Sequence, residues 1–230
     1  MKKRNFSLYI GIFLVSIILF LFLLSFVALP YEVDAMDTGN RFAEASRDHI
    51  LGTDQFGRDI YSRILVSTRS ALAVGVTSVF FGALVGLFIG AVAALSPKAV
   101  EVVVMRGVDA MMAFPGILSA MVLSAILGKG VMNASIAISF FMVPVFARLS
   151  YSMILENGKK GYVKAARSYG VSLPRLLVFH MLPDMLTRLV TQFSSSVGAA
   201  IVTASSRSFL GLGIQPPGAS LGLMLSEAKA

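Results

Sequence analysis

The residues of this chain that could carry chemistry are few. It contains no cysteine and two histidines, His49 and His180, among 230 residues. No G-x-S-x-G, H-E-x-x-H or paired-carboxylate arrangement lies within an apolar run, so we expect neither a catalytic residue nor a metal site. The string at residues 157–161 combines glycine and lysine but lacks the spacing of a phosphate-binding loop. Any ATP that this protein uses must therefore be hydrolysed by another chain.

A polar segment, residues 156–183, has a spacing that predicts a defined structure. Four residues on one helical face predict a short amphipathic helix: Tyr162, Val163, Ala166 and Tyr169. Gly170 occupies the position at which a C′ glycine would end that helix. Ser172 could cap a second helix that has Pro174 in its first turn and runs to Pro183. Two short helices joined by small residues would form a projection that a partner protein can push.

Polar side chains also recur along a later, otherwise apolar run. They follow one helical stripe: Gln192, Ser195, Ser196, Ala199, Thr203 and Ser206. Polar residues inside a membrane helix usually face the bundle interior or a water-filled cavity, so this stripe could line a pathway. The alternative is that the hydroxyl groups bond to carbonyl groups four residues earlier in the same helix.

The elements that must position these residues follow from an apolar composition. Hydrophobic residues make up 56% of the chain and charged residues 14%, whereas a soluble domain has about a quarter of its residues charged. Five charge-free runs are long enough to cross a bilayer: residues 8–29, 70–95, 110–128, 130–147 and 189–206. We therefore predict an all-α membrane protein, a polytopic helical bundle with five transmembrane helices.

The positions of glycine residues predict the structure of two segments, residues 70–95 and 208–225. Four of them share one helical face in the second run: Gly75, Gly82, Gly86 and Gly90. Small residues at that spacing let another helix approach closely, so we expect a tight crossing. Residues 208–225 are also free of charge, but Pro216, Pro217 and several glycines disfavour a helix there, and we predict a loop.

The distribution of charge predicts the orientation. The net charge is +8. Basic residues cluster at Lys2, Lys3 and Arg4 and in residues 156–188, whereas residues 30–69 hold five arginines and seven acidic residues. The two basic regions should lie in the cytoplasm and residues 30–69 outside. Because the basic residues lie in connections and not on one face, no nucleic-acid partner is expected. The first run is long for the core of a cleaved signal peptide, the competing interpretation.

The polar segment also has the spacing of a known motif. Residues 162–170, followed after nine residues by the string at 180–183, resemble the EAA loop of ABC importer permeases, E-A-A-x3-G-x9-I-x-L-P. The resemblance implies a coupling-helix loop that seats in a groove of an ATPase and converts its ATP-driven closure into alternating access. The coupling residues that it implies are Tyr162, Lys164, Ala165, Ala166, Gly170, Leu182 and Pro183.

Two further strings, residues 49–72 and 208–217, resemble the "C"-type permease subunits of dipeptide, oligopeptide and nickel importers. The external motif in the first string comprises Gly52, Thr53, Asp54, Gly57, Arg58, Asp59 and Arg63. From these residues alone we expect a solvated, turn-rich loop held by pairing among its aspartates and arginines. Contact with a binding protein is a secondary interpretation that rests on the predicted exposure of the loop.

The resemblance implies a set of partners. A homologous second permease would complete a heterodimer, two cytoplasmic ATPase subunits would carry ATP and Mg, and an external solute-binding protein would deliver cargo. This chain itself would bind no cofactor. It would lie in the cytoplasmic membrane of a prokaryote as a multi-pass protein with its N-terminus inside. Residues 1–69 would form the N-terminal transmembrane helix plus an external segment, and residues 70–230 the permease transmembrane domain.

The sequence departs from the family pattern at four places, the first of which is Asp184, where asparagine is common after Leu-Pro. Lys164 stands where the family usually has glutamate, and Ala204 stands where many relatives carry an acid. The family fold has six transmembrane helices, so we expect residues 70–230 to lack the last one. Import of di- or oligopeptides is the leading interpretation. The alternatives are import of nickel or a metal chelate by the same machinery, and a non-transporting or defective truncated membrane subunit.

Overall fold

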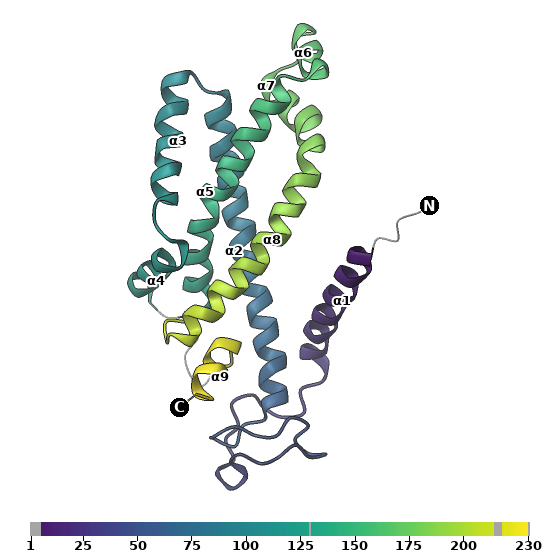
Figure 1. Ribbon diagram of the computed structural model, residues 1–230, viewed down its shortest axis with the longest axis vertical. Coiled ribbons are helices and arrows are strands. Elements are labelled where there is room, and N and C mark those ends of the chain that lie inside the picture. The colour runs from purple at the N-terminus through teal and green to yellow at the C-terminus, as the bar shows by residue number, and fades with distance from the viewer. Residues whose placement is uncertain (1–5, 129, 214–217, 230) are drawn as a thin grey trace. The chain divides into compact units, whose positions relative to one another are not determined.

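The computed structural model describes residues 6–128, 130–213 and 218–229, and these residues are mostly helical and contain no β-strand. The helices are α1 Phe6–Val27, α2 Ile60–Leu95, α3 Lys98–Met112, α4 Gly116–Leu127, α5 Val131–Gly158, α6 Gly161–Ser168, α7 Leu173–Leu176, α8 Leu182–Phe209 and α9 Leu221–Glu227 (Figure 1). A 3-10 turn, Thr38–Asn40, and a π-helical segment, Leu177–Met181, complete the elements. The prediction of an all-α protein is confirmed. Several residues used in the predictions lie outside the described residues: Lys2, Lys3, Arg4, Pro216 and Pro217.

Three helices in the described part of the chain are long and apolar enough to cross a membrane: Leu8–Val27, Ile60–Leu95 and Val131–Gly158. They correspond to the first, second and fourth predicted membrane helices. The fifth predicted run lies within α8, which has 28 residues and is therefore about 42 Å long. Its polar stripe lowers its hydropathy, so α8 is not among the three. The count of five transmembrane helices stays a prediction.

The third predicted membrane helix, residues 110–128, is wrong as a single helix. In the structure α3 ends at Met112 and α4 begins at Gly116 after Pro115. Proline has no N–H group to donate and disfavours a helical conformation at the preceding residue, Phe114. The helix therefore ends before Pro115, and α4 has only 12 residues.

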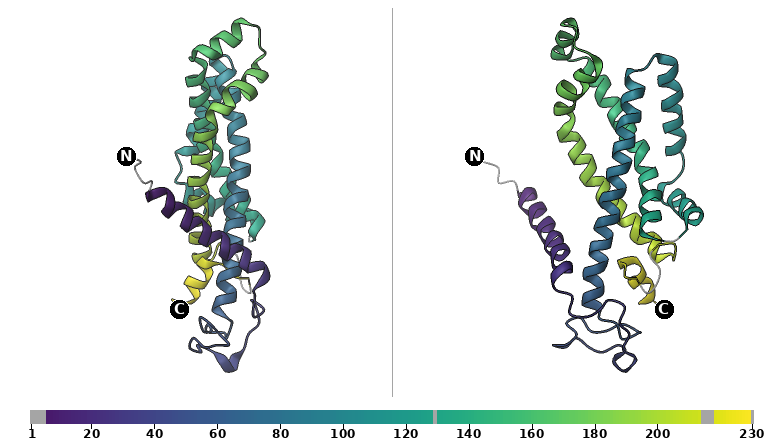
Figure 2. Two further views of the ribbon diagram at one scale, coloured as in Figure 1. Left: turned by 90° about the vertical axis from the view of Figure 1, so that its right-hand side faces the viewer. Right: turned by 180° about the vertical axis from the view of Figure 1, so that it is seen from behind.

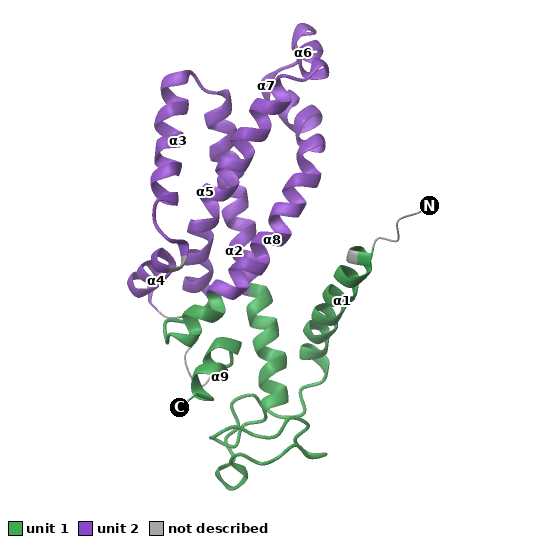
Figure 3. Ribbon diagram, in the orientation of Figure 1, with its two compact units in different colours: residues 1–73, 129–131, 204–230 green, residues 74–128, 132–203 purple. Residues whose placement is uncertain are grey.

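The chain divides into two compact units, which we describe separately (Figure 3). The bundle unit comprises residues 74–128 and 132–203, and the terminal unit comprises residues 1–73, 129–131 and 204–230. In the bundle unit, α3 and α5 run beside α2 (Figures 1 and 2). The Tyr151 hydroxyl donates to Glu101 Oε1 at 2.6 Å, and Arg148 forms an ion pair with Asp109.

The glycine face of α2 forms the predicted tight crossings within the bundle unit. A Cβ atom added at Gly82, Gly86 or Gly90 would collide with the backbone of α5. One added at Gly75 would lie 2.7 Å from Cγ1 of Ile201 on α8. The prediction is confirmed, because at these positions no side chain fits without moving a neighbouring helix.

In the terminal unit, the prediction of a loop over residues 208–225 is wrong at both ends, and at the first end α8 continues to Phe209. Helix α9 begins at Leu221, where the Ser220 hydroxyl accepts a hydrogen bond from the Leu223 N–H at 3.2 Å. This is an ordinary N-cap, and it supplies one of the helix-initiating contacts. Gly222 lies against the Ser205 carbonyl, where a Cβ atom would collide. The glycine that argued against a helix is therefore the residue that lets α9 approach the end of α8.

Candidate functional site

Residues 161–172, which we call the knob, contain α6 and the turn after it (Figure 1). Gly170 has φ +75°. Its N–H donates to the Arg167 carbonyl at 3.0 Å, and the Val171 N–H donates to the Ala166 carbonyl at 3.2 Å. These two bonds form a Schellman motif, which ends a helix with a left-handed residue at C′. The predicted role of Gly170 in ending the helix is confirmed.

The knob stands on an apolar cluster that we call the pedestal. Val163 is fully buried, and Ala166 packs against the same cluster. The other members of the pedestal come from α5, α7, the π-helical segment and α8: Met153, Ile154, Leu176, Met181, Met185 and Leu189. Burial of these side chains positions α6 without any buried charge.

The outer face of α6 differs from the predicted amphipathic pattern. Tyr169 is 88% exposed and Tyr162 is 42% exposed, so the predicted four-residue apolar face is wrong at both ends. The helix has only two turns, and the Schellman turn carries Tyr169 away from the pedestal. Among the coupling residues implied by the resemblance, Lys164 and Ala165 are also exposed and Ala166 is half-buried.

The predicted second short helix does not end at Pro183. Ser172 is the N-cap of α7 and Pro174 lies in the first turn, as predicted, but the Ser172 side chain makes no capping hydrogen bond. α7 continues through the π-helical segment into α8, which begins at Leu182. The Leu182 N–H donates to the Leu177 carbonyl five residues earlier. The wider π turn lies just before Pro183, the residue that cannot donate to an α-helical ladder, so the chain passes it without a break.

Two ion pairs join the elements beneath the knob. Lys160 contacts Asp184 on α8, and the Tyr162 hydroxyl lies 3.4 Å from the same carboxylate. Both charged groups are exposed and precede the apolar part of α8. The hydrogen bond from Lys160 lowers the pKa of Asp184, and the same bond raises the pKa of Lys160. Arg188 donates to Glu156 at 2.6 and 3.1 Å.

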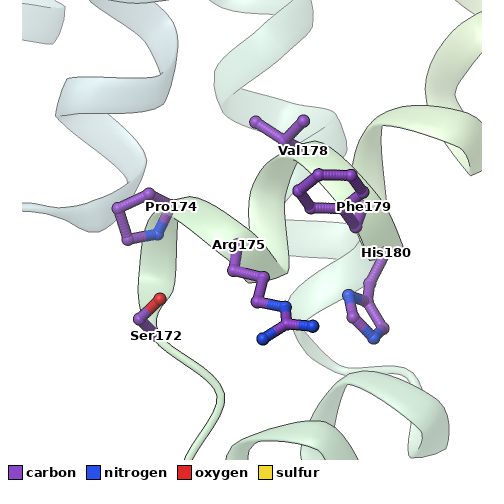
Figure 4. A pocket seen from close by; sticks show the side chains of 6 residues that line it. All are labelled: Ser172, Pro174, Arg175, Val178, Phe179 and His180. Carbon is purple, nitrogen blue, oxygen red and sulfur yellow. The ribbon is translucent and has the colours of Figure 1, made fainter.

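A hollow of about 590 Å³ lies beside the knob (Figure 4). It is lined by Ser172, Pro174, Arg175, Val178, Phe179 and His180. Phe179 is 70% exposed, and Val178 is also exposed. Apolar side chains this exposed next to an arginine are typical of a surface that another protein covers. The motif includes His180, but it did not identify Arg175, Val178 and Phe179, because they lie in its nine-residue gap of unspecified residues.

The polar stripe of α8 is not a uniform face in the structure. Gln192 Nε2 donates to Ser196 Oγ at 3.2 Å, and Ser196 is buried. Thr203 Oγ1 donates to the Ala199 carbonyl at 2.8 Å, the back-bonding that the alternative interpretation predicts. Ser195 and Ala199 are exposed. The alternative of back-bonding is therefore confirmed at Thr203, and a pathway-lining role of the stripe stays a prediction.

In the terminal unit, the external motif is held by a buried arginine. Arg58 is 1% exposed. Its Nε donates to Asp54 Oδ2 and its Nη2 to Glu227 Oε2 on α9, both at 2.6 Å. The predicted pairing of Asp54 with Arg58 is confirmed, and the predicted solvated loop is wrong. The chain separation of 169 residues explains why no local pattern indicated Glu227.

Arg63, in the first turn of α2, lies in the same network and is fully buried. It lies 3.8 Å from carboxylate oxygens of both Asp54 and Glu227, and its Nη1 donates to the Val33 carbonyl at 3.1 Å. We call residues 31–63 together with α9 the arginine module. Two guanidinium groups and two shared carboxylates form its centre, so the module combines segments from both ends of the described chain.

The remaining motif residues stabilise the arginine module through hydrogen bonds and close backbone contacts. Asp59 pairs with His49, with Oδ1 and Nδ1 3.0 Å apart, and its Oδ2 accepts the Ser62 N–H at 2.8 Å. The predicted partner of Asp59 was an arginine, so that part of the pairing is wrong. Gly52 and Gly57 have φ +74° and +75°, and a Cβ atom at either would collide with backbone. The buried Thr53 hydroxyl accepts the Ala43 N–H at 2.8 Å.

Comparison with known proteins identifies the family to which this chain belongs. Residues 82–230 match the family described as binding-protein-dependent transport system inner membrane component. The chain is 38% identical over 229 residues, 99% of its length, to the glutathione transport system permease protein GsiD of Pectobacterium atrosepticum. It is 36% identical over its whole length to the proteins of that name from Escherichia coli O6:K15:H31 and Shigella boydii serotype 4. The aligned part is 76% of each relative. The chain belongs to this family, the permease subunits of ABC importers of the peptide/nickel type, in which ATP hydrolysis lies on separate subunits.

Proposed function

We propose that this protein is the "C"-type permease subunit of an ABC importer of di- or oligopeptides, and that the knob couples ATPase motion to alternating access. The observation that carries the proposal is the construction of α6. A Schellman turn at Gly170 and a buried Val163 fix the helix on its pedestal, while Lys164, Ala165 and Tyr169 are exposed. Such a projection can seat in a partner protein without losing its own support.

The residues that the proposal assigns to coupling have distinct parts in it. Ala165 and Gly170 have small side chains, so they leave room at the outer surface for the groove of a partner protein. Tyr162, Lys164 and Ala166 flank that surface, and Leu182 and Pro183 begin the helix that would carry the motion onward. The exposed Phe179 in the neighbouring hollow extends the same surface with an apolar side chain.

The proposed assembly follows the family. This chain would pair with a homologous second permease, and two ATPase subunits with ATP and Mg would bind the cytoplasmic side. A solute-binding protein would deliver cargo from outside. We propose that the N-terminus and the knob lie in the cytoplasm and the arginine module outside, in accordance with the excess of basic residues around the knob. Exposed polar residues of α8, above all Ser195, would line the pathway.

The proposed cargo is a small peptide. The relatives at 36–38% identity are named as glutathione transport proteins, which favours a peptide-sized solute over the alternative, nickel or a metal chelate. Uptake of labelled glutathione, dialanine, trialanine and a Ni(II) chelate by the reconstituted complex compares these classes directly. Preference for Ni(II) over all three peptides would contradict the proposed cargo.

A substitution at Gly170 tests the coupling proposal. A Cβ atom there meets no atom within 4 Å, and aspartate is among the residues that best tolerate a left-handed conformation. Gly170→Asp should therefore leave membrane insertion and folding intact while its carboxylate blocks seating of the knob. We expect uptake and cargo-stimulated ATPase activity in proteoliposomes containing all subunits to fall at least tenfold.

Gly211 offers a matched control for this test. It has φ +76°, its Cβ position is equally open, and it lies outside the knob. Gly211→Asp should retain uptake near the wild-type level. Equal uptake by Gly170→Asp and wild type would refute coupling through the knob. A wild-type complex that assembles but imports no solute would favour the alternative of a non-transporting subunit.

A further inference from the structure

Phe42 has an unusual backbone conformation for an exposed residue. It is the one non-glycine residue with positive φ among those that the structure describes, at +51°, and its side chain is 73% exposed. A bulky side chain in the left-handed region raises the backbone energy, and such strain persists only where the surroundings fix it. At 73% exposure, the aromatic ring gains little compensating burial against the residues that the structure describes.

The surroundings of Phe42 do fix its backbone. The Phe42 N–H donates to the Asp54 carbonyl at 3.2 Å, and the Thr53 N–H donates to the Ala43 carbonyl at 3.1 Å. The Thr53 hydroxyl, which is buried, accepts the Ala43 N–H at 2.8 Å. These bonds tie Phe42 to the segment that carries Asp54 and Arg58, so the ring is presented by the rigid part of the arginine module.

A cavity adjoins the ring on the module's own surface. It has a volume of about 430 Å³, and Phe42 forms part of its wall together with Gln55, Met224 and Ala228. A protruding aromatic side chain beside a partly apolar hollow is the geometry of an anchor residue at a protein interface. The cavity also gives a partner side chain a place to enter next to the ring.

The exposed residues of the arginine module include more carboxylates than guanidinium groups. Residues 31–57 expose five carboxylates: Glu32, Asp34, Asp37, Glu44 and Asp48. They expose two guanidinium groups, those of Arg41 and Arg47. Arg58, Arg63 and Asp59 are buried and Asp54 is half-buried, so the exposed residues keep the excess of three carboxylates over arginines that residues 31–63 have in the sequence. The exposed part of the segment that carries Phe42 is therefore acidic.

We propose that Phe42 and the acidic surface around it form the docking site for the solute-binding protein, on a basic face of that protein that holds an apolar pocket for the ring. This inference rests on the proposed function for its partner and its side of the membrane. An acidic surface repels anionic lipid headgroups, which disfavours the membrane as the occupant. Complementary charge would speed association, and the ring would slow dissociation.

Two substitutions at Phe42 test the proposal with opposite expectations. Asn adopts the left-handed conformation more readily than Phe, so Phe42→Asn should keep or increase the protease resistance of residues 31–59 while removing the ring. Binding of the solute-binding protein of the same system to the full transporter in nanodiscs should weaken at least tenfold. Phe42→Tyr keeps an aromatic ring and should bind as wild type does.

The charge component has its own measurement. Glu44→Gln with Asp48→Asn should lower the association rate several-fold in 50 mM salt and leave it unchanged in 500 mM salt, where charges are screened. Wild-type affinity of Phe42→Asn would overturn the proposal. So would loss of pairing with the second permease in that variant, because the surface would then be a subunit interface. A wild-type complex that docks the binding protein without importing peptide would refute the proposed function alone.

Discussion

The knob exposes its charged side chains and buries apolar ones, whereas the arginine module buries two guanidinium groups at its centre. Beneath the knob, Lys160 and Arg188 pair with carboxylates in contact with solvent, where ion pairs contribute little to stability. In the module, the buried Arg58 and Arg63 share the half-buried carboxylates of Asp54 and Glu227. Removal of one partner from such a network leaves an unpaired buried charge, so the module depends on its ion pairs and the knob does not.

Two glycines with the same backbone angle show this difference at single positions. Gly57 and Gly170 both have φ +75°. A Cβ atom at Gly57 would collide with the Asp37 carbonyl, whereas one at Gly170 would meet no atom within 4 Å. The first glycine is required by the packing of its own chain. The second leaves open space, which a partner can occupy.

The largest expected effect breaks the centre of the arginine module. Arg58→Met removes the group that binds Asp54 and Glu227 and leaves both half-buried carboxylates with only Arg63, 3.8 Å from each, as a cationic neighbour. We expect this to destabilise the module by about 3–5 kcal/mol. Hydrogen exchange of residues 31–59 in nanodiscs should rise strongly, with little change in α6.

A double variant serves as the control for that prediction. Arg58→Met combined with Glu227→Met removes a cation and an anion together, so it should recover part of the lost protection. Equal exchange of wild type and Arg58→Met would show that the module does not depend on the buried pair.

A smaller effect is expected from the apolar support of the knob. Val163→Ala removes two methyl groups from a fully buried position and should destabilise the packing of α6 by about 2 kcal/mol. Hydrogen exchange should rise in α6 while residues 31–59 keep their protection. Unchanged exchange in α6 would mean that the pedestal does not hold the knob.

The smallest effect concerns the exposed ion pair of Lys160 and Asp184. The lowered pKa of Asp184 means that its contribution is present above its ordinary pKa, about 4, and is lost as the pH falls through the lowered value. The raised pKa of Lys160 means that its contribution is lost only as the pH rises above about 10. Between these limits the contribution of this ion pair to stability should not vary with pH.

Lys160→Met supplies the comparison for this prediction. The small difference in α6 exchange between this variant and wild type should be constant from about pH 5 to 9 and shrink below about pH 4. A difference that changed near neutral pH would assign the titration to another group.

Local pattern predicted much of the fold and of the knob. Charge-free length identified the helices that contain residues 8–27, 70–95 and 131–147, and glycine spacing identified the crossings of α2. Gly170 was identified as a helix terminator because a C′ glycine is a local signal. The broken third helix could have been anticipated from Pro115, which interrupts an otherwise apolar run.

Contacts distant along the chain could not be predicted in this way. The arginines of the external motif looked solvated because their partner Glu227 lies far along the sequence, in a helix that the glycines nearby argued against. The exposure of Tyr169 depends on the geometry of the turn at Gly170, which periodicity alone does not describe. Propensity and spacing determine elements, whereas burial depends on which elements meet.

The π-helical segment Leu177–Met181 has a consequence for the direction in which α8 faces. A π turn holds one more residue than the α-helical turn it replaces, and one residue corresponds to about 100° of rotation. The phase of the polar stripe relative to the knob is therefore set by this one inserted residue. Deletion of a single residue between 177 and 181 would restore an α-helical register and turn Ser195 about a quarter of the way around the helix axis.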